Sequence, residues 1–160
     1  MIWPLWGMDA FAEIDLDPLH PGAALIARGV SRVFSELAWT SVIELTLANR
    51  RRADVCALSP QGDIAIVEIK SSVADFRSDH KWPEYQPYCD QFYFAVSHDF
   101  PKDLVPDEAG LIVADGFGGV ILREPDRSSL KAARRKAVML RFAHAAAGRL
   151  MQLNSSSSQV

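Results

Sequence analysis

One stretch of sequence decides the fold: RADVCALSPQGDIAIVEIK, which runs from Arg52 to Lys70. Residues 52–58 have the apolar, β-branched pattern of a strand, and residues 59–63 combine Ser, Pro, Gly and Asp, as turns do. Residues 64–70 are almost continuously apolar until their end, which is typical of a central strand with both faces buried. We therefore expect two adjacent strands joined by a short turn.

The elements around this stretch complete a mixed α/β domain. Pro21 and Gly22 begin a predicted helix with apolar residues at helical spacing up to Leu37, and Ser72 caps a second helix. Further strands are predicted over 42–47, 91–96, 110–114 and 119–123, a short helix over 83–88, and a long helix over 128–153. We expect one domain over residues 1–153, in which Trp3, Trp6 and Phe11 suggest that part of the first segment packs down. A disordered Ser-rich tail is expected over 154–160.

Composition excludes several classes of protein. The chain has 160 residues, 49% of them hydrophobic, and a formal net charge of −3, which is too apolar and too weakly charged for a disordered chain. No apolar run approaches the ~18 residues of a spanning helix, so no membrane partner is expected. The first residues lack the basic region of a secretory signal. Cys56 and Cys89 form no metal or disulfide pattern and suit a reducing, cytoplasmic location.

Three chemically active residues should meet at one place on the sheet. Glu68 and Lys70 lie two residues apart and therefore share a strand face. Asp54 lies fourteen positions before Glu68, which is the separation that two strands joined by a short turn produce. Two carboxylates about 4 Å apart repel by roughly 4 kcal/mol at an effective dielectric of 20, so a raised pKa or a bound cation must compensate. Oxygen-only ligands favour Mg²⁺ or Mn²⁺.

A simpler interpretation of these three residues uses no cation. Glu68 and Lys70 would be strand-end charges in water, and Asp54 would pair with an arginine of the run 50–52. Short patterns of this kind recur by chance.

The context of the three residues adds a family resemblance. An Asp on a strand, a turn, a strand ending in Glu-x-Lys, a helix and a further strand resemble the PD-(D/E)XK nuclease superfamily, over roughly residues 23–96. The chain more particularly resembles the MmcB family of bacterial DNA-repair proteins. The residues that carry this likeness are RRRADV (50–55), IVEIKSS (66–72), DF (75–76), DHKW (79–82), Tyr85 and YCDQFYFAV (88–96).

The resemblance implies a fold and a set of site residues. The fold would be restriction-endonuclease-like, with a central mixed sheet flanked by helices. Asp54 and Glu68 would be metal ligands, the Ile69 carbonyl a third, and Lys70 the catalytic lysine. Many superfamily members also use a Glu from the first helix. Here Glu44 on the first strand is the preferred candidate, although a solvent-facing charge on an edge strand is as compatible with its position.

A second group of residues is expected to contact nucleic acid. Lys131, Arg134 and Arg135 share a helix face and would track phosphates, or would simply be a solvated face. The other candidates each have a structural alternative: solvated loop residues for the arginines, a solvated partner of Asp79 for Lys81, and the end of a strand for Gln91. These other candidates are Arg50, Arg51, Arg52, Lys81, Tyr85 and Gln91.

Together these observations predict a Mg²⁺- or Mn²⁺-dependent DNA phosphodiester hydrolase acting in repair, with other repair proteins as further partners. Two alternatives stay open: a non-catalytic DNA-binding accessory protein, and a structural protein acting as a homodimer through its aromatic N-terminal segment. Metal-dependent stabilisation would separate the first function from both alternatives.

Overall fold

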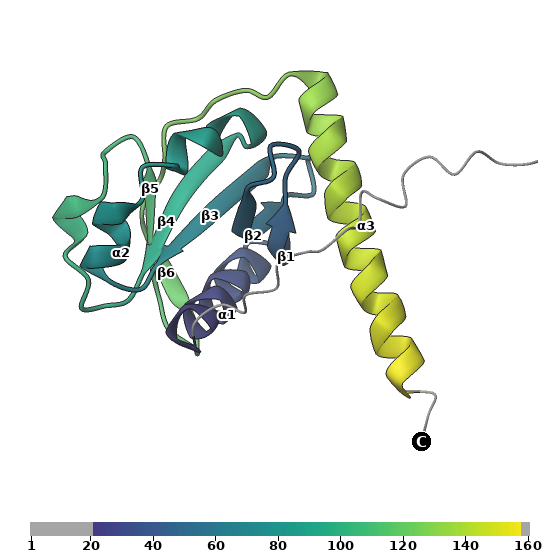
Figure 1. The fold of residues 1–160 in the computed structure, drawn as a ribbon, viewed down its shortest axis with the longest axis horizontal. Helices are drawn as coiled ribbons and strands as arrows, with labels where there is room; N and C mark the ends of the chain where they lie inside the picture. The colour runs from purple at the N-terminus through teal and green to yellow at the C-terminus, as the bar shows by residue number, and fades with distance from the viewer. Residues whose placement is uncertain (1–20, 158–160) are drawn as a thin grey trace, which may run out of the picture.

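The computed structural model describes residues 21–157 (Figure 1). The expectation that Trp3, Trp6 and Phe11 pack down concerns residues outside that range. Six strands and three α-helices dominate the described part of the chain. Their bounds are α1 Pro21–Glu36, β1 Thr40–Thr46, β2 Arg52–Leu58, β3 Ile64–Lys70, α2 Val73–Ser78, β4 Gln91–Val96, β5 Gly110–Ala114, β6 Gly119–Arg123 and α3 Ala132–Ser157.

The strands form one mixed sheet in sequence order, from β1 to β6. The strands β1, β2 and β3 are antiparallel neighbours, β3, β4 and β5 run parallel, and β6 returns antiparallel to β5. The predicted α/β fold with a central mixed sheet flanked by helices is confirmed at this level. The change from antiparallel to parallel pairing occurs at β3, because the segment between β3 and β4, which contains α2, crosses over the sheet.

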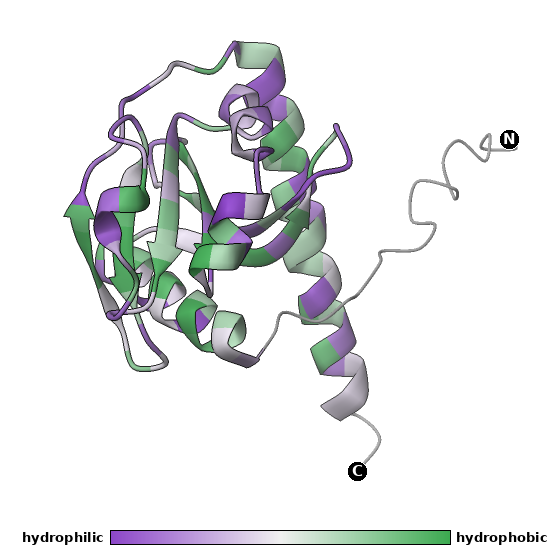
Figure 2. Ribbon diagram, turned by 60° about the vertical axis from the view of Figure 1, so that its left-hand side comes forward, coloured by the Kyte–Doolittle hydropathy of each residue, from purple (hydrophilic) through white to green (hydrophobic). Residues whose placement is uncertain are grey.

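The central strand β3 is buried along its whole length, including Glu68 and Lys70. Side chains on its two faces enter different cores. Val67 and Ile69 pack with Tyr93 under α1, whereas Ile66 packs with Phe94 on the opposite face. In Figure 2 the strands are largely hydrophobic and the surrounding loops mostly hydrophilic.

The helix α3 packs on the core that contains Ile66 and Phe94. Only two of its residues, Val138 and Phe142, are buried there. Its second half extends beyond the sheet (Figure 1). Within residues 21–157 no helix combines the length and the apolar character that crossing a bilayer requires.

Several boundaries differ from the predictions. The strand β1 spans Thr40–Thr46 instead of 42–47, and α1 ends at Glu36, one residue before the predicted Leu37. Residues 82–88 form two 3₁₀ turns, Trp82–Glu84 and Gln86–Tyr88, because Pro87 has no N–H to continue an α-helix. The helix α3 begins at Ala132 rather than at 128, since Asp90 binds the backbone N–H groups of Ser128 and Leu130. It also continues to Ser157, past the predicted end at 153. There the hydroxyls of three consecutive serines donate to carbonyls four residues earlier, which satisfies these carbonyls within the helix.

Candidate functional site

Asp54 and Glu68 lie side by side where β2 and β3 separate. The backbone pairing between these strands ends at Val55 and Val67, and the same register places Asp54 opposite Glu68. Beyond that pair the strands are joined by a side chain in place of the backbone: the Ile69 N–H donates to Asp54 Oδ2 at 2.7 Å. The Asp54 carboxylate is thus held against the end of β3.

Lys70 completes the group predicted from the sequence. Its side chain is only 5% exposed, and its Nζ lies 3.8 Å from Glu68 Oε1. A direct hydrogen bond joins the same Nζ to Asp79 Oδ2. The structure therefore brings Asp54, Glu68 and Lys70 together as the strand register predicted, and it adds a fourth charged residue.

Burial makes the two carboxylates hard to ionise. It raises the pKa of Glu68 to about 8, and the charge of Asp54 contributes in the same direction. Burial also raises the pKa of Asp54 to about 6, although the hydrogen bond from Ile69 opposes this. Both shifts mean that the pair retains a proton, or acquires another positive charge, near neutral pH.

Lys70 and Asp79, in contrast to the two strand carboxylates, both favour their charged forms. Burial works against the charge on Lys70, but the hydrogen bond to Asp79 and the nearby Glu68 carboxylate outweigh it and raise the pKa of Lys70. Burial similarly disfavours ionised Asp79, yet the bonds from Lys70 and from the Lys81 N–H lower the pKa of Asp79. These two groups are therefore an ion pair.

Glu44 lies beside Asp54 in the register between β1 and β2. It falls between the pairs Ile43–Val55 and Leu45–Ala53 and has a φ of 55°, in the left-handed region. Its side chain is 19% exposed, and Glu44 Oε1 lies 3.6 Å from a guanidinium nitrogen of Arg52. Glu44 is thus an edge-strand carboxylate that is mostly covered, and its charge acts on Asp54.

The oxygen atoms of this group provide a test of whether a divalent cation fits. Among the described residues, Glu68 Oε2 and Glu44 Oε1 are buried and have no hydrogen-bond partner. Unpartnered carboxylate oxygens are the donors that Mg²⁺ and Mn²⁺ prefer. Over residues 21–157, however, no three Asp, Glu, His or Cys side chains form a group that could hold a metal ion. The donor chemistry therefore fits the cation. Two carboxylates on neighbouring strands, Asp54 and Glu68, would bind it, and a group of three metal-binding side chains is not formed by the described residues.

Asp79 is a site residue that the sequence pattern did not reveal. It follows α2, nine positions after Lys70, and the sequence suggests it only as a partner of Lys81. The backbone N–H of Lys81 does donate to Asp79 Oδ1 at 2.8 Å, but the other oxygen binds Lys70. A signal was present, since a buried ammonium requires a carboxylate, and the shortness of α2 keeps its end near β3.

Tyr85 and Gln91 lie at opposite ends of β3. Tyr85 is buried, stacks on Phe92 and donates its hydroxyl to the Arg52 carbonyl at 3.0 Å. Burial, together with the nearby charges of Glu68, Asp54 and Asp79, raises the pKa of Tyr85, so its ring lies beside the carboxylate group and its contact with a phosphate stays a prediction. Gln91 pairs in register with Ala65, at the far end of β3 from Glu68. It is therefore not part of the carboxylate group.

The arginine run 50–52 is largely engaged within the protein. Arg51 makes two hydrogen bonds to the Glu84 carboxylate, at 2.7 and 2.9 Å, and Arg52 pairs with Glu44. Arg50, with a φ of 66°, is exposed, as is Lys81. Of these four residues, Arg50 and Lys81 are the two whose exposure suits a contact with nucleic acid.

The three basic residues predicted to track phosphates along the last helix have different environments. Arg135 makes a bidentate contact with the buried carboxylate of Asp90, at 2.7 and 2.8 Å, and also donates to the Gly62 carbonyl. Arg134 lies over the Tyr88 ring, 4.5 Å from its centroid. Lys131 precedes the first residue of α3 and is exposed. Arg135 is thus a structural residue that fastens α3 to the sheet.

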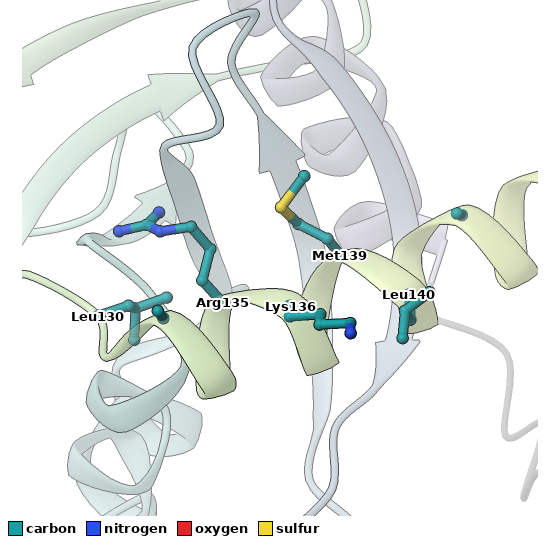
Figure 3. A pocket seen from close by; sticks show the side chains of 7 residues that line it. Leu130, Arg135, Lys136, Met139 and Leu140 are labelled. Atoms are coloured by element: carbon teal, nitrogen blue, oxygen red, sulfur yellow. The ribbon is translucent and has the colours of Figure 1, made fainter.

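A hollow of about 540 Å³ lies along the first half of α3 (Figure 3). Leu130, Met139 and Leu140 make its lining mostly apolar, and Lys136 lies among them. None of the carboxylates of the site lines it, so this hollow is separate from the candidate chemistry. Cys56 and Cys89 are both buried and free.

Comparison with known proteins identifies the family. The chain is similar to the solved structure of SPO1766, a protein of unknown function from Silicibacter pomeroyi. The sequences are 40% identical, the TM-score is 0.83, and the match covers 89% of this chain and 97% of the other. No curated protein matches the chain. The family described as DNA repair protein MmcB-like matches residues 18–157, and the chain therefore belongs to the MmcB-like family of DNA repair proteins.

Proposed function

We propose that this protein is a nuclease, a Mg²⁺- or Mn²⁺-dependent hydrolase of DNA phosphodiester bonds, on a restriction-endonuclease-like fold. Membership of the MmcB-like family supports a role in DNA repair. One observation carries the proposal further. Glu68 is buried and Asp54 half-buried beside Lys70, both with raised pKa values, and Glu68 Oε2 has no hydrogen-bond partner among the described residues. A divalent cation would satisfy that oxygen and remove the repulsion between the carboxylates.

The residues of the site have distinct roles in this proposal. Asp54 and Glu68 would hold the cation together with the Ile69 carbonyl, and Glu44, whose charge acts on Asp54, is a further candidate. A bound divalent cation supplies Lewis-acid stabilisation of phosphate charge and a more acidic water. Lys70 would orient the attacking water and stabilise the negative charge that develops on the phosphate oxygens. Arg50 and Lys81, both exposed, would contact the DNA backbone.

The order of the elements supports assignment to the PD-(D/E)XK superfamily. The Asp on β2, the Glu-x-Lys at the end of β3, the following α2 and the parallel β4 occur in the expected sequence. The alternation of β3 and its register with β2 bring Glu68, Lys70 and Asp54 to one place, which supports the proposal of a single metal site.

A cleavage assay on several DNA structures tests the proposal. Linear, nicked, flapped and branched DNA would each be incubated with the protein and Mn²⁺, and with EDTA in parallel. Loss of a catalytic group typically costs about 10²- to 10⁴-fold, so Lys70→Ala and Asp54→Ala should cleave at least about 100-fold more slowly than the unmodified protein. Lys136→Ala, an exposed lysine on α3, should retain full activity. Equal, low degradation by all four proteins would refute the nuclease assignment.

A specific observation favours a second candidate, a non-catalytic DNA-binding accessory protein. The Lys70 ammonium is engaged in an ion pair with Asp79 and is hardly exposed. No three metal-binding side chains are grouped in residues 21–157. An accessory protein would bind DNA equally well with EDTA or Mn²⁺, and Lys70→Ala would not weaken that binding. A filter-binding or fluorescence-anisotropy titration therefore distinguishes the two functions.

A further inference from the structure

The Lys70 ammonium lies between two carboxylates but is hydrogen-bonded to only one of them. It forms a hydrogen bond with Asp79 Oδ2, whereas Glu68 Oε1 is 3.8 Å away, beyond hydrogen-bond reach. The side chains of Glu68, Lys70 and Asp79 are 12%, 5% and 15% exposed. With so little contact with water, the position of the ammonium depends on which carboxylate attracts it more strongly.

Asp79 is itself firmly placed. The Ser72 hydroxyl caps α2 by accepting from the Asp75 N–H, and the Phe76 ring packs on Phe94 and Phe100 at centroid distances of 5.2 and 5.8 Å. Asp79 ends this helix and accepts the Lys81 N–H at its other carboxylate oxygen. Both oxygens of Asp79 therefore have partners, and α2 brings them to the end of β3.

Glu68 is left open by this arrangement. Glu68 Oε2 has no hydrogen-bond partner among the described residues, although a buried ammonium lies close by. Without the Asp79 charge, Glu68 would be the nearest carboxylate to Lys70, and a buried ammonium does not remain unpaired. Lys70 would then move onto Glu68.

We propose that Asp79 is a positioning residue, which holds the Lys70 ammonium off Glu68 and so keeps the Glu68 carboxylate available to a divalent cation. The inference rests on the proposed function for the identity of the cation, Mg²⁺ or Mn²⁺. Asp79 acts through Lys70 and touches neither the cation nor the DNA. A pairing that blocks Glu68 would weaken cation binding and slow the chemical step, while contacts with the DNA backbone would be unaffected.

The test compares Asp79→Asn with the unmodified protein. The amide keeps the size of the side chain and its bond from the Lys81 N–H but removes the charge. Loss of a residue that orients a metal ligand typically costs about 10- to 100-fold in metal affinity or activity. We therefore expect Asp79→Asn to need at least about tenfold more Mn²⁺ for half of its maximal rise in melting temperature. Its kcat on DNA should fall by a similar factor, and its KM should change less than about twofold.

Two further variants distinguish the loss of this one carboxylate from a general loss of negative charge near the site. Asp75→Asn removes the same charge from α2 at an exposed residue that does not bond to Lys70, and it should behave as the unmodified protein. Asp79→Glu retains a carboxylate on a longer side chain and should recover part of the Mn²⁺ affinity. It also keeps the test usable if Asp79→Asn fails to fold, because its Mn²⁺ midpoint should then still lie above that of Asp75→Asn, and an equal midpoint would refute the positioning role.

The possible outcomes separate this inference from the nuclease proposal. If Asp79→Asn requires no more Mn²⁺ than the unmodified protein, the positioning role is refuted even where the protein cleaves DNA. If Mn²⁺ stabilises the protein and Asp79→Asn shifts the midpoint but no DNA is cut, the positioning role stands and the nuclease assignment fails. Absence of any stabilisation by Mn²⁺ overturns both.

Discussion

Replacing Glu68 by glutamine should stabilise the folded protein in alkaline solution when no divalent cation is present. The pKa of Glu68 is raised from 4.5 to about 8, so between these values the folded protein binds a proton that the unfolded chain has released. The free energy of unfolding must then decrease as the pH rises through that range. A glutamine at position 68 does not titrate, so the variant lacks the part of this decrease that Glu68 contributes.

The pKa of Glu68 sets the size of the effect. One pH unit of difference between the folded and unfolded pKa corresponds to about 1.4 kcal/mol, so the shift to about 8 allows at most about 5 kcal/mol. We expect the unmodified protein to lose about 2–3 kcal/mol more than Glu68→Gln between pH 5 and pH 9, roughly half of this limit, because Glu68 and Asp54 titrate as a coupled pair and the variant retains the share of Asp54. For a chain of this size that corresponds to about 5–10 °C in melting temperature.

The assay is thermal and urea unfolding in EDTA at both pH values. The quantity compared is the change in unfolding free energy between them, which cancels differences in packing between glutamate and glutamine. Glu36→Gln is the matched control, since its side chain is 71% exposed and an exposed ion pair contributes about 0–1 kcal/mol. If Glu68→Gln loses as much stability as the unmodified protein when the pH is raised, the burial argument for the carboxylate pair is refuted.

The remaining predictions concern the framework that supports the site. Asp90→Ala should cost about 2–4 kcal/mol in urea unfolding, because it removes the acceptor for the Ile64 and Leu130 N–H groups as well as the partner of Arg135. Arg134→Ala should cost less than about 1 kcal/mol. Similar costs for the two variants would show that Asp90 does not fasten α3. Gly29→Ala should destabilise strongly, since a Cβ there would lie 2.1 Å from the Asp115 carbonyl oxygen. A Cβ at Gly148 would meet no neighbouring group within 4 Å, so Gly148→Ala should raise the free energy of unfolding by about 0.5–1 kcal/mol, because alanine is favoured over glycine in a helix. A melting temperature for Gly29→Ala at or above that of Gly148→Ala would contradict the close packing of α1 on the loop after β5.

Short-range patterns in the sequence were sufficient for much of the fold. The bounds of β2, β3, β4, β5 and β6 agree with the predicted ranges, because each strand is a run of apolar and β-branched residues bordered by turn residues. The convergence of Asp54, Glu68 and Lys70 was predictable for a related reason. Two antiparallel strands joined by a short turn have a fixed register, so sequence separation determines which side chains are neighbours.

Contacts between distant segments were not predictable in this way. Asp79 and Lys70 are joined through the path of α2, and Arg135 meets Asp90 across 45 residues. An arginine or a tyrosine has the same local pattern whether it is exposed or buried, so Arg135 and Tyr85 were expected at a nucleic-acid surface although they form part of the framework.

Local periodicity and one short connection are thus enough to specify the strands, their alternation and the central carboxylate–lysine group. The partners of the charged side chains follow only from the folded chain: Asp79 with Lys70, Glu44 with Arg52, and Asp90 with Arg135. Such pairing depends on proximity in space and on exclusion of water, and neither is encoded in the spacing of residues along a single element.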